Sequence, residues 1–272
     1  MHTQQTPMKK LIGITFMIFI LCTSCEKKQS NSKTDAKEKN EVMVLGMLHS
    51  GHLKHEVYNL EVVADLITKI DPDIILTEIP PDRYDAAIEG FKRDDTISEP
   101  RVMRFPEYTD VVFPLSKKMD FKIIPTAGWT KPMADKRSGQ LRAIRDDADR
   151  AADWKAYTEA NQKTDSLMEA TGHRYDPYFV NSDEYDEISE VGLSVYNDLF
   201  NEELGPGGWD NINAAHYGHI EDALEKHTMQ GKRILITYGA GHKGWFMRQL
   251  RKRSDIKLIN LKEAVGGDQS SQ

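Results

Sequence analysis

The chain has 272 residues, enough for about one large or two small domains at roughly 150 residues per domain. A hydrophobic fraction of 39% and a charged fraction of 29% exclude a disordered, collagen-like or coiled-coil chain. The net charge of −7, without a long basic run, argues against a nucleic-acid binder. Its two cysteines, Cys22 and Cys25, exclude a disulfide scaffold and Cys-based zinc motifs.

The N-terminus has the layout of a secretory signal. Basic residues Lys9 and Lys10 precede an apolar run, 11–22, that is shorter than the roughly 20 residues of a membrane-spanning helix. Thr23, Ser24 and Cys25 resemble a bacterial lipobox, although Cys22 stands where Leu is usual. We therefore expect a signal peptide over 1–24 and lipidation of Cys25. The alternatives are a plain cleaved signal or an uncleaved anchor.

The predicted lipid would attach the protein to a membrane of the bacterial cell envelope, with its domain outside the cytoplasm. Residues 26–40 carry no large apolar side chain, so we expect 25–40 to be a disordered tether. One folded domain is predicted over 41–265, followed by a disordered tail over 266–272.

From residue 41 onward, short β-branched runs alternate with longer helical patterns, which predicts an α/β domain with a mainly parallel sheet flanked by helices. Apolar residues recur at helical spacing between Val57 and Ile70, and the stretch 133–204 predicts a helical insertion without strands. Gly205–Gly208 interrupts this pattern before another helix. The expected strands are Val42–Leu45, Ile74–Ile79, Phe121–Pro125, Arg233–Tyr238 and Ile256–Leu261.

Two strands lead into the same pattern, Gly-x-x-His, which ends at His49 and at His242. Glycine would let the chain turn sharply at the carboxyl end of a strand, where open α/β sheets bind ligands. Glu78 ends another strand and should emerge at the same edge. Two imidazoles and a carboxylate are a ligand set for a divalent metal that leaves positions open for water. Alternatively, the histidines bond to backbone, and Glu78 caps a helix or pairs with Arg83.

These segments resemble the superfamily of TraB and Tiki proteins, the haem-binding lipoprotein ChaN and erythromycin esterases. The resemblance covers roughly 41–265 and is closest to a branch of uncharacterised bacterial proteins. It rests on both Gly-x-x-His motifs, on Glu78 after Asp71-Pro72-Asp73, and on the run from Arg233 to His242. It implies an α/β fold with a helical insertion and a site of His49, Glu78 and His242. Members of this superfamily cleave peptides or a lactone, or bind haem.

The resemblance also includes a Trp followed by Arg-Asn at the third and fourth positions. Trp209 and Asn213 match, but Ile212 replaces the arginine, which weakens the expectation of hydrolysis. Asn213 could orient a water or a carbonyl, or be an ordinary helix residue.

Other residues carry a structural and a functional interpretation side by side. Substrate contacts are expected from Tyr58, Arg104 and Trp209, with Arg104 a spatial substitute for the missing arginine. His52 and His55 are extra ligands or loop residues, and Trp129 with Thr126 either packs or lines the pocket. His216 and His219 form an interface pair, unless their helix face turns to the crevice and His216 completes a metal shell.

The sequence thus predicts a hydrolase that cleaves a peptide or ester bond with an activated water. Catalysis would rest on His49, Glu78, His242 and Asn213, with Mn, Co or Zn held by the first three. In a metal-free version, one histidine would deprotonate the water and Glu78 would orient it. The substrate would be an unidentified small molecule or peptide, and the oligomeric state is not predicted. A haem or iron-binding lipoprotein and a non-catalytic relative are the alternatives. No Gly-x-Ser-x-Gly elbow or phosphate-binding loop is present.

Overall fold

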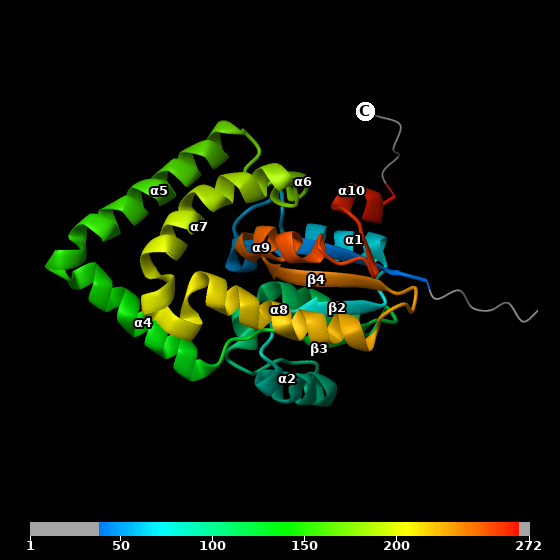
Figure 1. Ribbon diagram of the computed structural model, residues 1–272. Coiled ribbons are helices and arrows are strands. Elements are labelled where there is room, and N and C mark those ends of the chain that lie inside the picture. The colour runs from blue at the N-terminus through cyan, green and yellow to red at the C-terminus, as the bar shows by residue number, and fades with distance from the viewer. Residues whose placement is uncertain (1–37, 267–272) are drawn as a thin grey trace, which may run out of the picture. The chain divides into compact units, whose positions relative to one another are not determined.

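The computed structural model describes residues 38–266, and within them five strands form one sheet (Figure 1). All strand pairs are parallel, and the order across the sheet is β3-β2-β4-β1-β5. The predicted α/β class and its five strands are confirmed. The strands are β1 (Asn40–Met47), β2 (Ile74–Thr77), β3 (Lys122–Pro125), β4 (Arg233–Gly239) and β5 (Ile256–Leu258).

The expected signal peptide, Cys25 and most of the expected tether lie outside the described residues. At its end the tether prediction is wrong, because Asn40 is buried and begins β1. The Asn40 side chain donates to the carbonyl of His227 and accepts the backbone N–H groups of Gln230 and Lys232. Within 38–266, every helix is too short or too polar to cross a bilayer.

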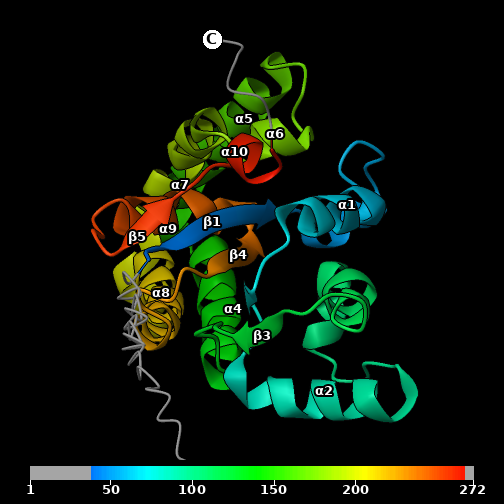
Figure 2. The ribbon, with the colours of Figure 1, turned by 90° about the vertical axis from the view of Figure 1, so that its right-hand side faces the viewer.

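Alternate residues of the strands face two hydrophobic layers, so both faces of the sheet are covered. Met43 and Leu45 of β1 belong to one layer, and Val42 and Val44 to the other. The first layer includes α1 (Leu60–Ile70), α2 (Pro81–Asp94), the π-helical segment η3 (Glu107–Val112), α3 (Phe113–Leu115) and α10 (Leu261–Ala264). The second includes α8 (Trp209–Lys226) and α9 (Ala240–Leu250), as Figure 2 shows.

The strand order places the segments singled out in the sequence next to one another. β4 lies between β1 and β2, with Val44 and Leu76 both opposite Ile236. His49, Glu78 and His242 follow these three adjacent parallel strands, so all three side chains start from one edge of the sheet.

The helical insertion is confirmed, although it begins at Lys131 rather than at residue 133. It packs around its own cluster, which includes Ile144, Tyr196 and Phe200. Figure 1 shows it beside the sheet layers, as helices coloured green to yellow. Its members are α4 (Lys131–Asp146), α5 (Ala151–Ala170), α6 (Pro177–Val180) and α7 (Asp183–Leu204).

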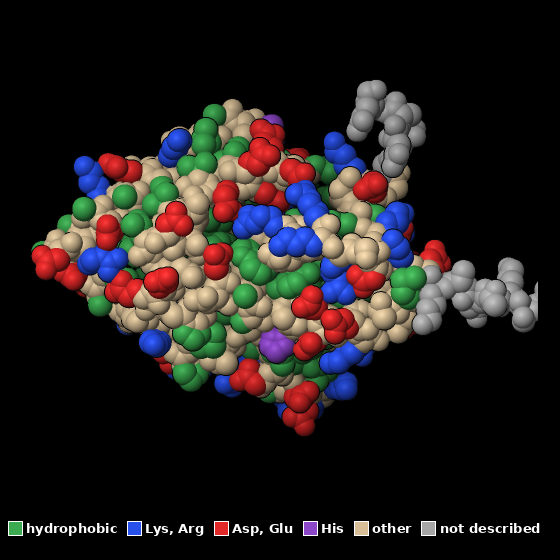
Figure 3. Space-filling model, in the orientation of Figure 1, with side chains coloured by type: hydrophobic (Ala, Val, Ile, Leu, Met, Phe, Trp, Pro, Cys, Tyr) green, Lys and Arg blue, Asp and Glu red, His purple; other side chains and the backbone are tan. Residues whose placement is uncertain are grey.

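Short 3-10 segments complete the described chain. They are η1 (His49–Leu53), η2 (Val102–Arg104), η4 (Ala148–Arg150) and η5 (Gly205–Gly207). On the face drawn in Figure 3, acidic and basic side chains are interspersed.

Candidate active site

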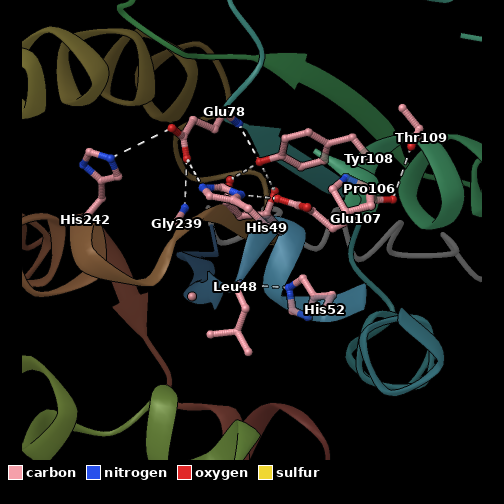
Figure 4. Close-up of polar contacts among 12 residues, drawn as sticks. Leu48, His49, His52, Glu78, Pro106, Glu107, Tyr108, Thr109, Gly239 and His242 are labelled. Carbon is pink, nitrogen blue, oxygen red and sulfur yellow. Dashed lines mark hydrogen bonds and ion pairs between the residues drawn. The ribbon is translucent and has the colours of Figure 1, made fainter. Parts of the chain in front are cut away.

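Glu78 is held rigidly at the carboxyl edge of the sheet, directly after β2 (Figure 4). Its side chain is buried, and Oε2 accepts the backbone N–H of Gly239 at 2.9 Å. The backbone N–H of Glu78 donates to the hydroxyl of Tyr108 at 2.8 Å, and that hydroxyl donates to the carbonyl of Thr237. Backbone and carboxylate are therefore both fixed in place.

His49 lies between two carboxylates. Its Nδ1 is 2.6 Å from Oε1 of Glu107, and its Nε2 is 3.5 Å from Oε2 of Glu78. Burial disfavours the charged imidazole, but the bonds to the two carboxylates outweigh it and raise the pKa of His49 to about 10. The His49 backbone has a φ of 51°, a left-handed conformation that costs free energy for a side chain of this kind. His49 is thus a strained residue that carries a proton at neutral pH.

His242 lies in the first turn of α9 with its tautomer fixed. Nδ1 is 2.7 Å from Oδ1 of Asn213, whose Nδ2 donates to the carbonyl of Trp209. The amide can therefore only accept from His242, so Nδ1 carries the proton and the lone pair is on Nε2. That Nε2 is 3.9 Å from Oε1 of Glu78. Burial lowers the pKa of His242 and keeps it neutral, while Trp209 stacks on its ring at 4.8 Å.

His216 of α8 is wholly buried and has the opposite tautomer. The backbone N–H of Gly128 donates to Nδ1 at 2.8 Å, so the proton of the neutral ring is on Nε2. This Nε2 has no hydrogen-bond partner among the described residues. Burial and the nearby His242 lower the pKa of His216 to about 3. The ring therefore presents an unused N–H donor.

Glu78, His216 and His242 bring one ligand atom each within 4.8 Å of one another, a group that could hold a metal ion. Zinc binds such atoms at roughly 2.0–2.2 Å, so small side-chain movements would complete the geometry. The expected ligand set had His49 in the place of His216. In the observed conformation, however, the Nε2 proton of His216 opposes ligation, since the lone pair of this ring already accepts from Gly128.

The two motif glycines allow close approach and do not form the expected sharp turn. Neither has a positive φ; the left-handed residue of the first motif is His49 itself. A Cβ on Gly239 would lie 2.6 Å from Nε2 of His49, and a Cβ on Gly46 would lie 3.0 Å from Cα of Ala240. The turn prediction is therefore wrong. The glycines instead let His49 and α9 pack against the strand ends.

One expected substrate contact and the two expected extra ligands have structural roles. Tyr58 is wholly buried and donates its hydroxyl proton to the carbonyl of Gly46. His52 is also buried, with Nε2 accepting from Leu48 and Nδ1 bonded to the carbonyl of Tyr58. His55 stacks on Tyr175. These three side chains are thus engaged away from Glu78.

Other sequence-predicted residues fall at or near the site. Arg104 and Trp129 line a cavity of about 240 Å³ together with Glu78. Ile212 stands where the resemblance expects an arginine, and its side chain is buried in the protein. His219, three residues after His216 on α8, is exposed, so the two do not form the expected interface pair. The alternative pairing of Glu78 with Arg83 is not observed, because Arg83 pairs with Asp82.

Glu107 is the residue that the sequence analysis missed. It begins η3, is wholly buried, and lies 58 positions from its partner His49 along the chain. A signal was present: Glu107 lies between the aromatic residues Phe105 and Tyr108, and a charge buried among such side chains requires a partner.

No family model, no curated protein and no solved structure matches this chain.

Proposed function

We propose that this protein is a hydrolase that uses an activated water at Glu78 to cleave a peptide or ester bond. The observation that carries the proposal is the buried Glu78 carboxylate between two imidazoles, each with its Nε2 nearest to it. Glu107 and Asn213 hold the other nitrogen of His49 and His242. Orientation of a reactive histidine by a second residue is the usual arrangement at catalytic and metal sites.

The donor set fits a divalent ion such as Mn, Co or Zn. Bound there, the ion would supply a water whose pKa is lowered towards neutrality. Glu78 and His242 belong both to the expected ligand set and to the observed group, so we assign them as ligands. His49 would serve as the third ligand only after it loses the Nε2 proton that it carries at neutral pH, while its Nδ1–H would stay on Glu107. His216 would have to give up the bond from Gly128.

The same residues also fit a metal-free reaction. His242, with its free Nε2 lone pair, would take a proton from water as the water oxygen attacks the carbonyl carbon. Glu78 would orient that water. The protonated His49 would donate to the leaving oxygen or nitrogen as its bond to the carbonyl carbon breaks. The N–H of His216 is available to an oxygen that gains negative charge.

Hydrolysis is tested with the purified protein on a panel of short peptides and esters. We expect Glu78→Gln and His242→Ala to lower turnover by about 10²- to 10⁴-fold, the usual contribution of a positioned acid or base. His219→Ala is the matched control, because this exposed histidine lies on α8 near His216. Unchanged turnover in a folded His242→Ala protein would overturn the proposal.

Metal dependence is tested separately by elemental analysis after gentle purification and by titration with Co²⁺, Mn²⁺ and Zn²⁺. Stoichiometric metal that is lost in both Glu78→Gln and His242→Ala supports the metal-dependent reaction. Turnover that survives a chelator supports the metal-free one.

Haem binding remains the second candidate through the family resemblance alone. The cavity at Glu78 measures about 240 Å³, below the roughly 300–1,000 Å³ typical of sites for drug-sized ligands. A Soret band on haem titration that disappears in His242→Ala would favour this alternative. A colourless protein after the same titration would count against it.

We also propose, from the sequence, that the chain is a TraB/Tiki-like lipoprotein attached to the cell envelope through Cys25. Mass spectrometry of the N-terminal peptide from native membranes tests the anchor. The expected species begins at Cys25 and carries acyl chains. An unmodified Cys25, or a chain that retains residues 1–24, would contradict it.

A further inference from the structure

Three arginines that have no ion-pair partner among the described residues line the cavity beside Glu78. Most arginines in the described chain pair with a carboxylate, but Arg101, Arg104, Arg137 and Arg142 do not. The first three of these four line this one cavity. Within it, Glu78 is the sole acidic residue among the described lining side chains, and its charge is opposed by His49.

Arg101 and Arg137 are not neutralised by a carboxylate among the described residues, and the surroundings of their guanidinium groups differ. One terminal nitrogen of Arg101, Nη1, is buried without a hydrogen-bond partner among the described residues. Arg137 donates to the hydroxyl of Tyr196, and its guanidinium lies 5.9 Å from the ring of Trp129. A buried donor without an acceptor costs free energy, and an incoming oxyanion would recover that cost.

Two aromatic side chains in the wall of the cavity, Phe105 and Trp129, pack against histidines of the site. Phe105 meets His49 edge to face at 4.8 Å, and Trp129 meets His216 at 6.1 Å. A ligand in this cavity would thus lie with its charged end on the arginines and its other end against Glu78.

We propose that this cavity binds the anionic group of the substrate, a carboxylate or a phosphate, and positions the bond to be cleaved at Glu78. Only the positioning of the bond rests on the proposed hydrolase function. The binding of an anion by the arginines does not depend on it. The planar guanidinium of arginine can donate two parallel hydrogen bonds to two oxygens of such a group, whereas the ammonium of lysine cannot. The substrate class is therefore a small anionic amide or ester, such as a short peptide with a free C-terminus.

Calorimetric titration of the full-length protein tests this inference with three probes: N-acetyl-alanyl-alanine, its C-terminal amide, and inorganic phosphate. We expect an anionic probe to bind, and the neutral amide to bind at least about tenfold more weakly. Whichever of N-acetyl-alanyl-alanine and inorganic phosphate binds with the higher affinity identifies the oxyanion that the site prefers. Equal binding of the acid and its amide, or binding of none of the three, would overturn the proposal.

Variants locate the binding. Arg104→Gln, at an exposed side chain, and Arg101→Gln should each weaken the anionic probe about tenfold. Arg101→Lys, which keeps the charge but not the fork, covers the case in which Arg101→Gln fails to fold. Arg142→Gln is the control, since Arg142 is unpaired but lies outside the cavity, and its affinity should stay within about twofold of wild type. Wild-type affinity in Arg104→Gln and in a folded Arg101 variant would contradict the assignment.

Glu78→Gln separates this inference from the proposed function. It should lower turnover by about 10²- to 10⁴-fold yet bind the anionic probe at least as well as wild type, because a negative charge has been removed from the cavity. If no substrate is ever turned over but the arginine variants lose the probe, the hydrolase proposal fails and the anion site stands.

Discussion

The two Gly-x-x-His segments have one sequence pattern and two different structures. After β1 the chain enters η1, and His49 takes a left-handed backbone beside Glu107. After β4 the chain passes directly into α9, and His242 points its Nδ1 at the amide of Asn213. The carboxylate of Glu107 keeps the first histidine charged, whereas burial lowers the pKa of the second and keeps it neutral. The surroundings that the rest of the chain supplies, not the motif, thus set the charge state.

This difference suits acid and base roles around one carboxylate. Burial raises the pKa of Glu78, but the hydrogen bond from His49 and the charge of that ring outweigh burial and lower the pKa to about 2. It is therefore an anion between a charged and a neutral imidazole, and groups with pKa values moved apart are typical of catalytic sites.

The largest effect should come from the glycine that admits His49. In Gly239→Ala the new Cβ would lie 2.6 Å from Nε2 of His49 and push the ring from Glu78, so turnover should fall about 100-fold or more. Gly46→Ala instead crowds the backbone of Ala240 and should cost about 1–3 kcal/mol of unfolding free energy.

Chemical denaturation and turnover, measured on both variants, separate the two roles. Gly139→Ala is the control, because a Cβ there meets nothing within 4 Å. Equal turnover in Gly239→Ala and wild type would show that turnover does not depend on the position of the His49 ring.

Asn213→Asp should make the second motif resemble the first. A carboxylate on Nδ1 favours the charged imidazole, which raises the pKa of His242 and removes its free lone pair at neutral pH. We expect turnover to fall about 10- to 100-fold, as for other changes to residues that orient a reactive histidine. The activity should also recover as pH rises, and a pH–rate profile with no such shift would argue against His242 as base or ligand.

The smallest effect is expected at the opposite edge of the sheet, which ion pairs hold together. Glu41 pairs with Arg233 and Lys257, and its pKa is lowered by these hydrogen bonds. A lowered pKa contributes stability above the unfolded value near 4.5, and this is lost as pH falls through the folded value. Glu41→Gln should therefore cost about 0.5–1 kcal/mol at pH 7 and less at pH 3.

Denaturation curves at both pH values measure that loss, and turnover should match wild type. A stability cost that is larger at pH 3 than at pH 7 would contradict the assigned ion pairs.

Much of the fold could be predicted, because the strands are short apolar runs and Gly205–Gly208 marks the end of the insertion. His49, Glu78 and His242 could be placed at one edge, since residues that follow neighbouring parallel strands meet there. Glu107 and Arg137 could not be placed: they reach the site from η3 and α4, and no local pattern encodes packing between distant segments. The tautomers of His216 and His242 depend on Gly128 and Asn213 in the same way.

Nitrogen-15 NMR of the histidine side chains, in protein freed of metal by a chelator, tests most directly whether distant partners set the charge states. At pH 7.5 the account predicts a doubly protonated His49, a His242 protonated on Nδ1, and a His216 protonated on Nε2. His49 should lose its proton only near pH 10, and Glu107→Gln should bring that transition down. A His49 that titrates near its ordinary value of 6.5 in the wild-type protein, or a His242 that is charged at pH 7.5, would contradict the account.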